Sequence, residues 1–175
     1  MPSEIVTVDR TREVELRVQF AEGWLGLGAP ADAQRELESL SDGERSLPAV
    51  LSLRWAILAA LDQWNAAYQV ALEQLDIVPH EVEGWINRSY ALRRMNGDRL
   101  REAMEGLIEA SERFPGEALV FYNLACYRCL FGQEDLALEL LQTAVSVSNR
   151  REILLMAKRD PDLQPLWRRL DRVLK

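Results

Sequence analysis

The side chains most capable of chemistry are two cysteines and the single histidine. Cys126 and Cys129 have the C-x-x-C spacing of redox pairs and of half a zinc site. A redox pair normally lies at a helix N-terminus, where the helix dipole lowers the thiol pKa, but these cysteines fall in the middle and last turns of a predicted helix. The one histidine, His80, follows Pro79 in a predicted loop. We therefore expect packing roles for both cysteines, an exposed His80, and no metal or other cofactor.

Enzyme motifs do not accompany these residues. The sequence contains no glycine-rich phosphate loop, no HExxH and no nucleophile elbow. It also lacks the second cysteine pair that would complete a zinc site. We predict a protein that is not an enzyme and has no catalytic residues.

Two arginines, Arg54 and Arg88, occupy equivalent positions in two predicted helices. A charged side chain in a packed seam needs an acceptor, because an unpaired buried charge is very costly. One interpretation is a pair of salt bridges between repeats, to acidic helix residues. The other is an anion-binding ladder for the carboxylates of a partner. We favour the salt bridges and keep both arginines as candidate partner-binding residues.

The helices that must position these residues form a series of hairpins. The best-defined hairpin covers residues 120–146, where apolar residues at spacings of three and four mark one stripe on each of two helices, with Gly132 between them. One hairpin cannot bury both stripes alone, so it needs copies on either side. The small residue that opens each second helix recurs at an almost constant interval, at Ala33, Ala67, Ala103 and Ala137.

An interval of about 34 residues with two helices per unit is typical of the tetratricopeptide repeat, or TPR. We predict an all-α protein, a right-handed α-solenoid of four TPR-like hairpins with C-terminal capping helices. The expected divisions are a polar N-terminal lead-in at 1–12, repeats at about 13–46, 47–80, 81–116 and 117–147, and capping helices at 148–175. In the cap, we expect Trp167 to face inward and to close the end of the core.

The chain also resembles a group of small stand-alone bacterial TPR proteins of unassigned function. The resemblance rests on RWAI at 54–57, GWINRSYAL at 84–92, YNLACYRCLFG at 122–132 and MAKRDPDLQPLW at 156–167. It covers nearly everything from about residue 14 and implies the repeat fold and the lack of a membrane anchor. It implies no particular reaction.

The repeat resemblance also suggests a binding surface. In TPR domains that bind extended peptides, an asparagine on the first helix of a repeat often hydrogen-bonds the peptide backbone, and Asn87 and Asn123 occupy one such repeat position. Tyr90, Arg94 and Tyr122 should project near them. These five residues are our candidate ligand-facing patch on the concave face. The clamp with which chaperone-tail binders hold a terminal carboxylate is incomplete in the earlier repeats.

Composition and charge limit the kinds of partner. The apolar fraction of 48% and charged fraction of 28% are ordinary for a soluble protein. The net charge of −7 disfavours nonspecific binding to nucleic acid or to an acidic membrane, although residues 149–175 carry eight basic and four acidic residues. Because the N-terminus is not a secretory signal and no apolar run approaches membrane-spanning length, we expect a cytoplasmic location.

These observations favour a non-catalytic scaffold for protein–protein interactions. We expect it to bind a peptide or helix in the concave groove formed by the first helices of the repeats. The alternative is a secretion-type chaperone that holds an export substrate. The expected state is a monomer or weak homodimer, with no nucleic acid or membrane partner.

Overall fold

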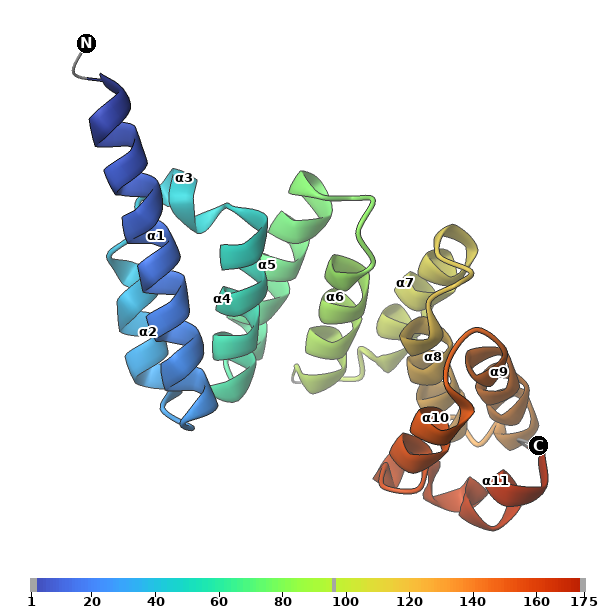
Figure 1. Ribbon diagram of the computed structural model, residues 1–175. Helices are drawn as coiled ribbons and strands as arrows, with labels where there is room; N and C mark the ends of the chain where they lie inside the picture. Colours follow the sequence, from blue (N-terminus) through green and yellow to red (C-terminus); the bar gives the residue numbers. More distant parts are fainter. Residues whose placement is uncertain (1–2, 96, 174–175) are drawn as a thin grey trace. The chain divides into compact units, whose positions relative to one another are not determined.

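The computed structural model describes residues 3–95 and 97–173, with the side chains of residues 10–95 and 97–170. Within these ranges the chain forms eleven α-helices and one 3₁₀ helix, and no strand occurs. The helices make up two compact units, residues 1–95 and 96–175. In Figure 1 the first unit runs from blue to green and the second from yellow to red.

The first unit begins with a long helix and continues as helical hairpins. Its helices are α1 (Ser3–Gly26), α2 (Pro30–Glu38), α3 (Asp42–Arg45), α4 (Pro48–Ala60), α5 (Trp64–Ile77) and α6 (Glu83–Arg94). α1 pairs with α2, α4 pairs with α5, and α6 packs on α5 (Figure 1). Because α1 starts at Ser3, most of the expected N-terminal lead-in is helical.

The second unit contains one well-packed hairpin and the C-terminal cap. Its elements are α7 (Leu100–Arg113), α8 (Ala118–Leu130), α9 (Glu134–Ser146), α10 (Arg150–Ala157), η1 (Pro161–Leu166) and α11 (Trp167–Val173). α8 pairs with α9 and also packs against α7, while η1 covers part of α8 and of α9. The cap therefore encloses the hairpin that the sequence defines best.

Buried alanines hold the helices of each unit together. Ala33, Ala67, Ala103 and Ala137 are all fully buried, as the repeat register predicts. A methyl side chain at this place lets neighbouring helices approach closely. The same register places a second apolar residue one turn later, and these residues are also buried: Leu37, Ala71, Leu107 and Leu141.

Three hairpin turns share one backbone conformation. Gly28, Asp62 and Gly132 each follow the first helix of a hairpin, and all three have a positive φ, of 73°, 55° and 71°. In each turn the next residue donates its N–H to the carbonyl five positions back, from Ala29 to Trp24, Gln63 to Leu58 and Gln133 to Arg128. This is the left-handed C-terminal stop of a helix, which favours glycine.

The cap differs in detail from the sequence prediction. Residues 161–166 form a 3₁₀ helix, and Pro165 lies inside it. Leu163, Leu166 and Leu170 are fully buried, but Trp167 is 38% exposed, so the expectation that Trp167 faces inward is wrong. Its indole Nε1 donates instead to the carbonyl of Ala157 at the end of α10, at 2.9 Å.

The short helix α3 is an addition that the sequence did not suggest. Ser41 and Glu44 form a capping box at its start. Arg10 on α1 donates to both carboxylate oxygens of Glu44, each at 2.6 Å. Hydrogen bonds from Arg10 and then from Ser41 lower the pKa of Glu44 to about 2. A bidentate ion pair thus ties the link between the first two hairpins to α1.

Candidate binding site

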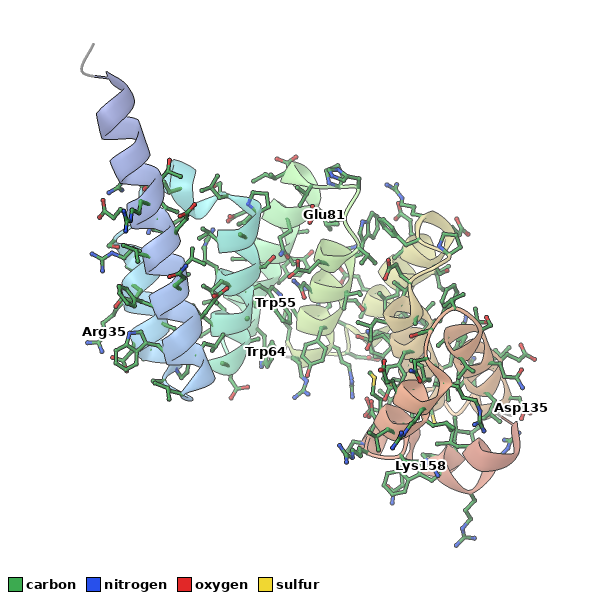
Figure 2. The ribbon with its side chains drawn as sticks, viewed as in Figure 1. Arg35, Trp55, Trp64, Glu81, Asp135 and Lys158 are labelled. Atoms are coloured by element: carbon green, nitrogen blue, oxygen red, sulfur yellow. The ribbon has the colours of Figure 1, made fainter. Side chains whose placement is uncertain are left out.

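An arginine–aromatic cluster joins three helices of the first unit. The ring of Tyr90 on α6 lies 6.0 Å from the ring of Trp55 on α4 and 5.8 Å from that of Trp64 at the start of α5. The Arg94 guanidinium lies 5.1 Å from the Tyr90 ring and 5.6 Å from the Trp64 ring, and Nη2 donates to the Tyr90 hydroxyl at 2.9 Å. Trp55 and Trp64 are labelled in Figure 2. We call Trp55, Trp64, Tyr90 and Arg94 the Arg94 cluster.

Contacts within the Arg94 cluster connect all four of its side chains. Its three rings are half-buried, and Arg94 is exposed. The Trp55–Tyr90 contact is edge-to-face and the Trp64–Tyr90 contact is tilted, and ring and cation–π contacts both depend on geometry. The sequence identified Tyr90 and Arg94 as candidates, but it missed Trp55 and Trp64. The signal for Trp64 was a large aromatic residue at the first position of a second helix, directly after the turn.

Asn87 is buried rather than presented at the surface. Only 6% of it is exposed, and its amide donates to Oε1 of Gln74 on α5 at 2.9 Å. Gln74 in turn approaches Ser52 on α4 at 3.4 Å, and the Ser52 hydroxyl donates to Glu83 at 2.8 Å. A polar path therefore links α4, α5 and α6 inside the first unit. The role of Asn87 in binding a ligand stays a prediction.

Arg54 and Arg88 lie on α4 and α6, and both are half-buried. Arg54 donates to Glu73 on α5 at 2.9 Å and to the Arg45 carbonyl at 3.2 Å. The salt bridge therefore joins the two helices of one hairpin, whereas we had expected a bridge between repeats. Arg54 also borders a cleft of about 680 Å³ between α2 and α5, whose lining includes Leu37, Ile57 and Val70.

The remaining two candidates lie in the second unit. Tyr122 on α8 is 5% exposed, and its hydroxyl donates to Oδ2 of Asp160 in the cap at 3.0 Å. Burial, together with the nearby Cys126 and Asp160, raises the pKa of Tyr122 well above its ordinary value. Asn123, the next residue, is half-buried. Tyr122 thus links the cap to α8. The role of Asn123 in binding a ligand stays a prediction.

The cysteines are buried, as predicted, and His80 is exposed. The Cys126 thiol lies 3.4 Å from the same Asp160 oxygen that Tyr122 contacts, and burial raises the pKa of Cys129. Cys126, Asp160 and Asp162 place their polar atoms within 4.8 Å of one another, the spacing of a possible metal site. We assign no metal there, because Asp160 already accepts bonds from Tyr122, from Cys126 and from the Asp162 backbone.

Helices long and apolar enough to span a bilayer do not occur among the described residues.

No protein-family model matches the chain, and no curated protein matches it. Several solved structures do. MamA from residue 41 to its end, from Desulfovibrio magneticus RS-1, superposes with a TM-score of 0.65 at 20% identity, over 93% of each chain. A double mutant of that MamA gives the same values.

A second protein identifies the fold by name. The thermophilic TPR protein TTC0263 of Thermus thermophilus superposes with a TM-score of 0.62 at 17% identity, over 92% of this chain and 98% of that one. The chain has a TPR-like fold. The all-α solenoid that the repeat register predicted is therefore confirmed. The TPR-like fold places the Arg94 cluster on first helices, α4 and α6, and on the start of the second helix α5.

Proposed function

We propose that this TPR-like chain is a non-catalytic scaffold that binds a peptide or a helix of a partner protein. The observation that carries the proposal is the Arg94 cluster. Tryptophan, tyrosine and arginine are the residues most enriched in binding hot spots, since they offer large rigid contact area and directed hydrogen bonds. Here they occur together, half-exposed and already held in place by their mutual contacts.

The chemistry of the Arg94 cluster defines what the partner should offer. One donor of Arg94 is used by the Tyr90 hydroxyl, which leaves the other N–H groups of this exposed side chain for a ligand. A carboxylate or backbone carbonyl of the partner can accept from them, with an apolar or proline side chain against the Trp64 and Tyr90 rings. The partner segment should therefore carry a hydrogen-bond acceptor and an apolar side chain within a few residues of each other. Neither nucleic acid nor a membrane is required.

The other candidates keep narrower roles within the proposal. Asn87 and Tyr122 act by positioning, because each is buried and hydrogen-bonded inside its own unit. Asn123 remains a candidate for a direct hydrogen bond to a bound segment. Arg54 and Arg88 are candidates for carboxylates of the partner, with Arg54 at the edge of the 680 Å³ cleft. A cytoplasmic location completes the proposal.

The experiment compares two arginines of the first unit. Arg94→Ala removes the guanidinium from the cluster, whereas Arg35→Ala removes one that projects from α2 and pairs locally with Asp32 (Figure 2). Affinity capture from native lysate with quantitative mass spectrometry should show at least a tenfold loss of partner peptides for Arg94→Ala alone. Equal capture by both variants would place the binding surface elsewhere and remove the support for this site.

A further inference from the structure

The first helix carries a second apolar surface that the described part of the chain does not cover. On one side of α1, Val14 and Ala21 are buried against α2 and α4. On the other side, four large apolar residues at helical spacings are exposed: Leu16 by 42%, Phe20 by 54%, Trp24 by 40% and Leu27 by 78%. We call these four residues the α1 stripe. A helix with apolar residues on two sides normally has neighbours on both.

The repeat register identifies the residues of the next hairpin that are equivalent to the α1 stripe, and their contacts can be compared. One repeat further along the chain, the α1 stripe corresponds to Val50, Arg54, Leu58 and Leu61 on and beside α4. Val50 is buried, and Leu61 packs against the core of the first hairpin. α2 packs against α4, and Leu37 of α2 borders the same cleft as Arg54 and Leu58. The α1 stripe is therefore the surface on which a repeat receives a neighbouring helix, and in α1 no helix of the described chain takes that place.

Two features of α1 favour another copy of the same helix as the neighbour. Residues 10–26 carry three arginines and three glutamates, so this segment is neutral in a chain of net charge −7. Two copies can meet there without the repulsion expected between other acidic surfaces. Gly23 lies between Phe20 and Leu27 in the sequence, and a Cβ at Gly23 would meet nothing within 4 Å. Glycine is unfavourable inside a helix, and nothing in the described chain requires it here.

The size of the stripe limits the strength of such pairing. Aromatic side chains bury roughly 150–250 Å² each, so the exposed parts of these four residues amount to on the order of 400 Å² per copy. A stable dimer buries about 800 Å² on each partner. We infer that the α1 stripe pairs with the α1 stripe of a second copy around a twofold axis near Gly23, as a weak and reversible homodimer. This surface is separate from the Arg94 cluster and does not depend on the proposed function.

The first test measures mass against concentration. Sedimentation velocity of the full chain, from a few micromolar to several hundred micromolar, should show the mass rising from one copy toward two. Phe20→Glu and Leu27→Glu should weaken this association at least tenfold. Leu130→Glu, at a leucine on α8 that is 45% exposed, should leave it unchanged. Circular dichroism of each variant confirms that the helices are retained.

The second test locates the contact without disturbing it. Gly23→Cys places a thiol at the expected axis, and Gly116→Cys places one at another open glycine position. The native cysteines are buried in both proteins. Under oxidised glutathione, Gly23→Cys should form disulfide-linked dimers at least tenfold faster than Gly116→Cys. A wild-type chain that stays monomeric, an association that Phe20→Glu leaves intact, or equal rates of cross-linking would each overturn the proposal.

Discussion

α6 of the first unit and α8 of the second hold the same place in consecutive repeats, yet their side chains serve different purposes. Asn87 on α6 corresponds to Asn123 on α8, and Tyr90 and Arg94 correspond to Cys126 and Leu130. α6 contributes Tyr90 and Arg94 to a half-exposed cluster. α8 instead buries Tyr122 and Cys126 against Asp160 of the cap. Equivalent positions in two repeats can therefore contribute to a candidate binding surface, as on α6, or to packing against the cap, as on α8.

The largest expected effect is on stability, through the packing of the cap against α8. Leu163 of the cap is fully buried, so Leu163→Ala should lower the free energy of unfolding by about 2–5 kcal/mol. Leu155→Ala, at a residue that is 49% exposed, is the matched control and should change it by less than about 0.5 kcal/mol. Thermal denaturation gives the sizes of the two effects. Amide exchange should show the loss of protection in α8 and α9, and equal effects would mean that the cap does not support α8.

The paired asparagines offer a sharper comparison. Asn87→Ala leaves the buried Gln74 carbonyl without its donor, which should cost about 1–3 kcal/mol of stability. Asn123→Ala, at the same repeat position, should cost less than about 0.5 kcal/mol. Urea denaturation of the two variants measures the difference. If both substitutions lower the free energy of unfolding equally, the two asparagines contribute equally to stability in α6 and α8.

Tyrosine hydroxyls provide a smaller contrast between the two helices. Tyr122→Phe removes a buried bond to Asp160 and should lower stability by about 1 kcal/mol. Tyr90→Phe removes only an acceptor for the exposed Arg94, so it should lower stability by no more than a few tenths of about 1 kcal/mol. The same denaturation measurement separates them. A larger effect for Tyr90 would show that the Arg94 cluster is a structural joint as well.

The two units should also respond to opposite extremes of pH. The pKa of Glu44 is about 2 in the folded chain against an ordinary 4.5, so its stabilising contribution is lost as the pH falls from about 4.5 to 2. The pKa of Tyr122 is raised, so its contribution is lost as the pH rises above about 10. Denaturation midpoints across this range should show both losses. Glu44→Gln should flatten only the acid limb and Tyr122→Phe only the alkaline limb.

The repeat could be predicted because it depends on local spacing. Ala33, Ala67, Ala103 and Ala137 recur wherever helices approach closely, and all four are buried. Pro48 lies in the first turn of α4, and the side chain of Asn149 caps α10. Such features depend on a few neighbouring residues, so one sequence is enough to find them.

The site could be predicted only in part, because it depends on contacts between helices. Tyr90 and Arg94 were found from their repeat positions, but their contacts with Trp64 depend on how α5 lies against α6. Asn87 was expected on the concave face from its repeat position, and its hydrogen bond to Gln74 on α5 is a contact between helices that this position does not reveal. Asp160 follows the last turn of α10, and no periodicity indicates that its carboxylate reaches Tyr122 and Cys126.

The shared left-handed turn has a consequence for the speed of folding. Gly28 and Gly132 adopt this backbone readily, so each of their hairpins can close through contacts that are near in sequence. Chains rich in such local contacts fold within microseconds to milliseconds. Asp62 has a Cβ, which makes the same conformation less favourable than it is for glycine. The turn between α4 and α5, the helices that carry Trp55 and Trp64, is therefore the one of the three whose backbone favours closure least.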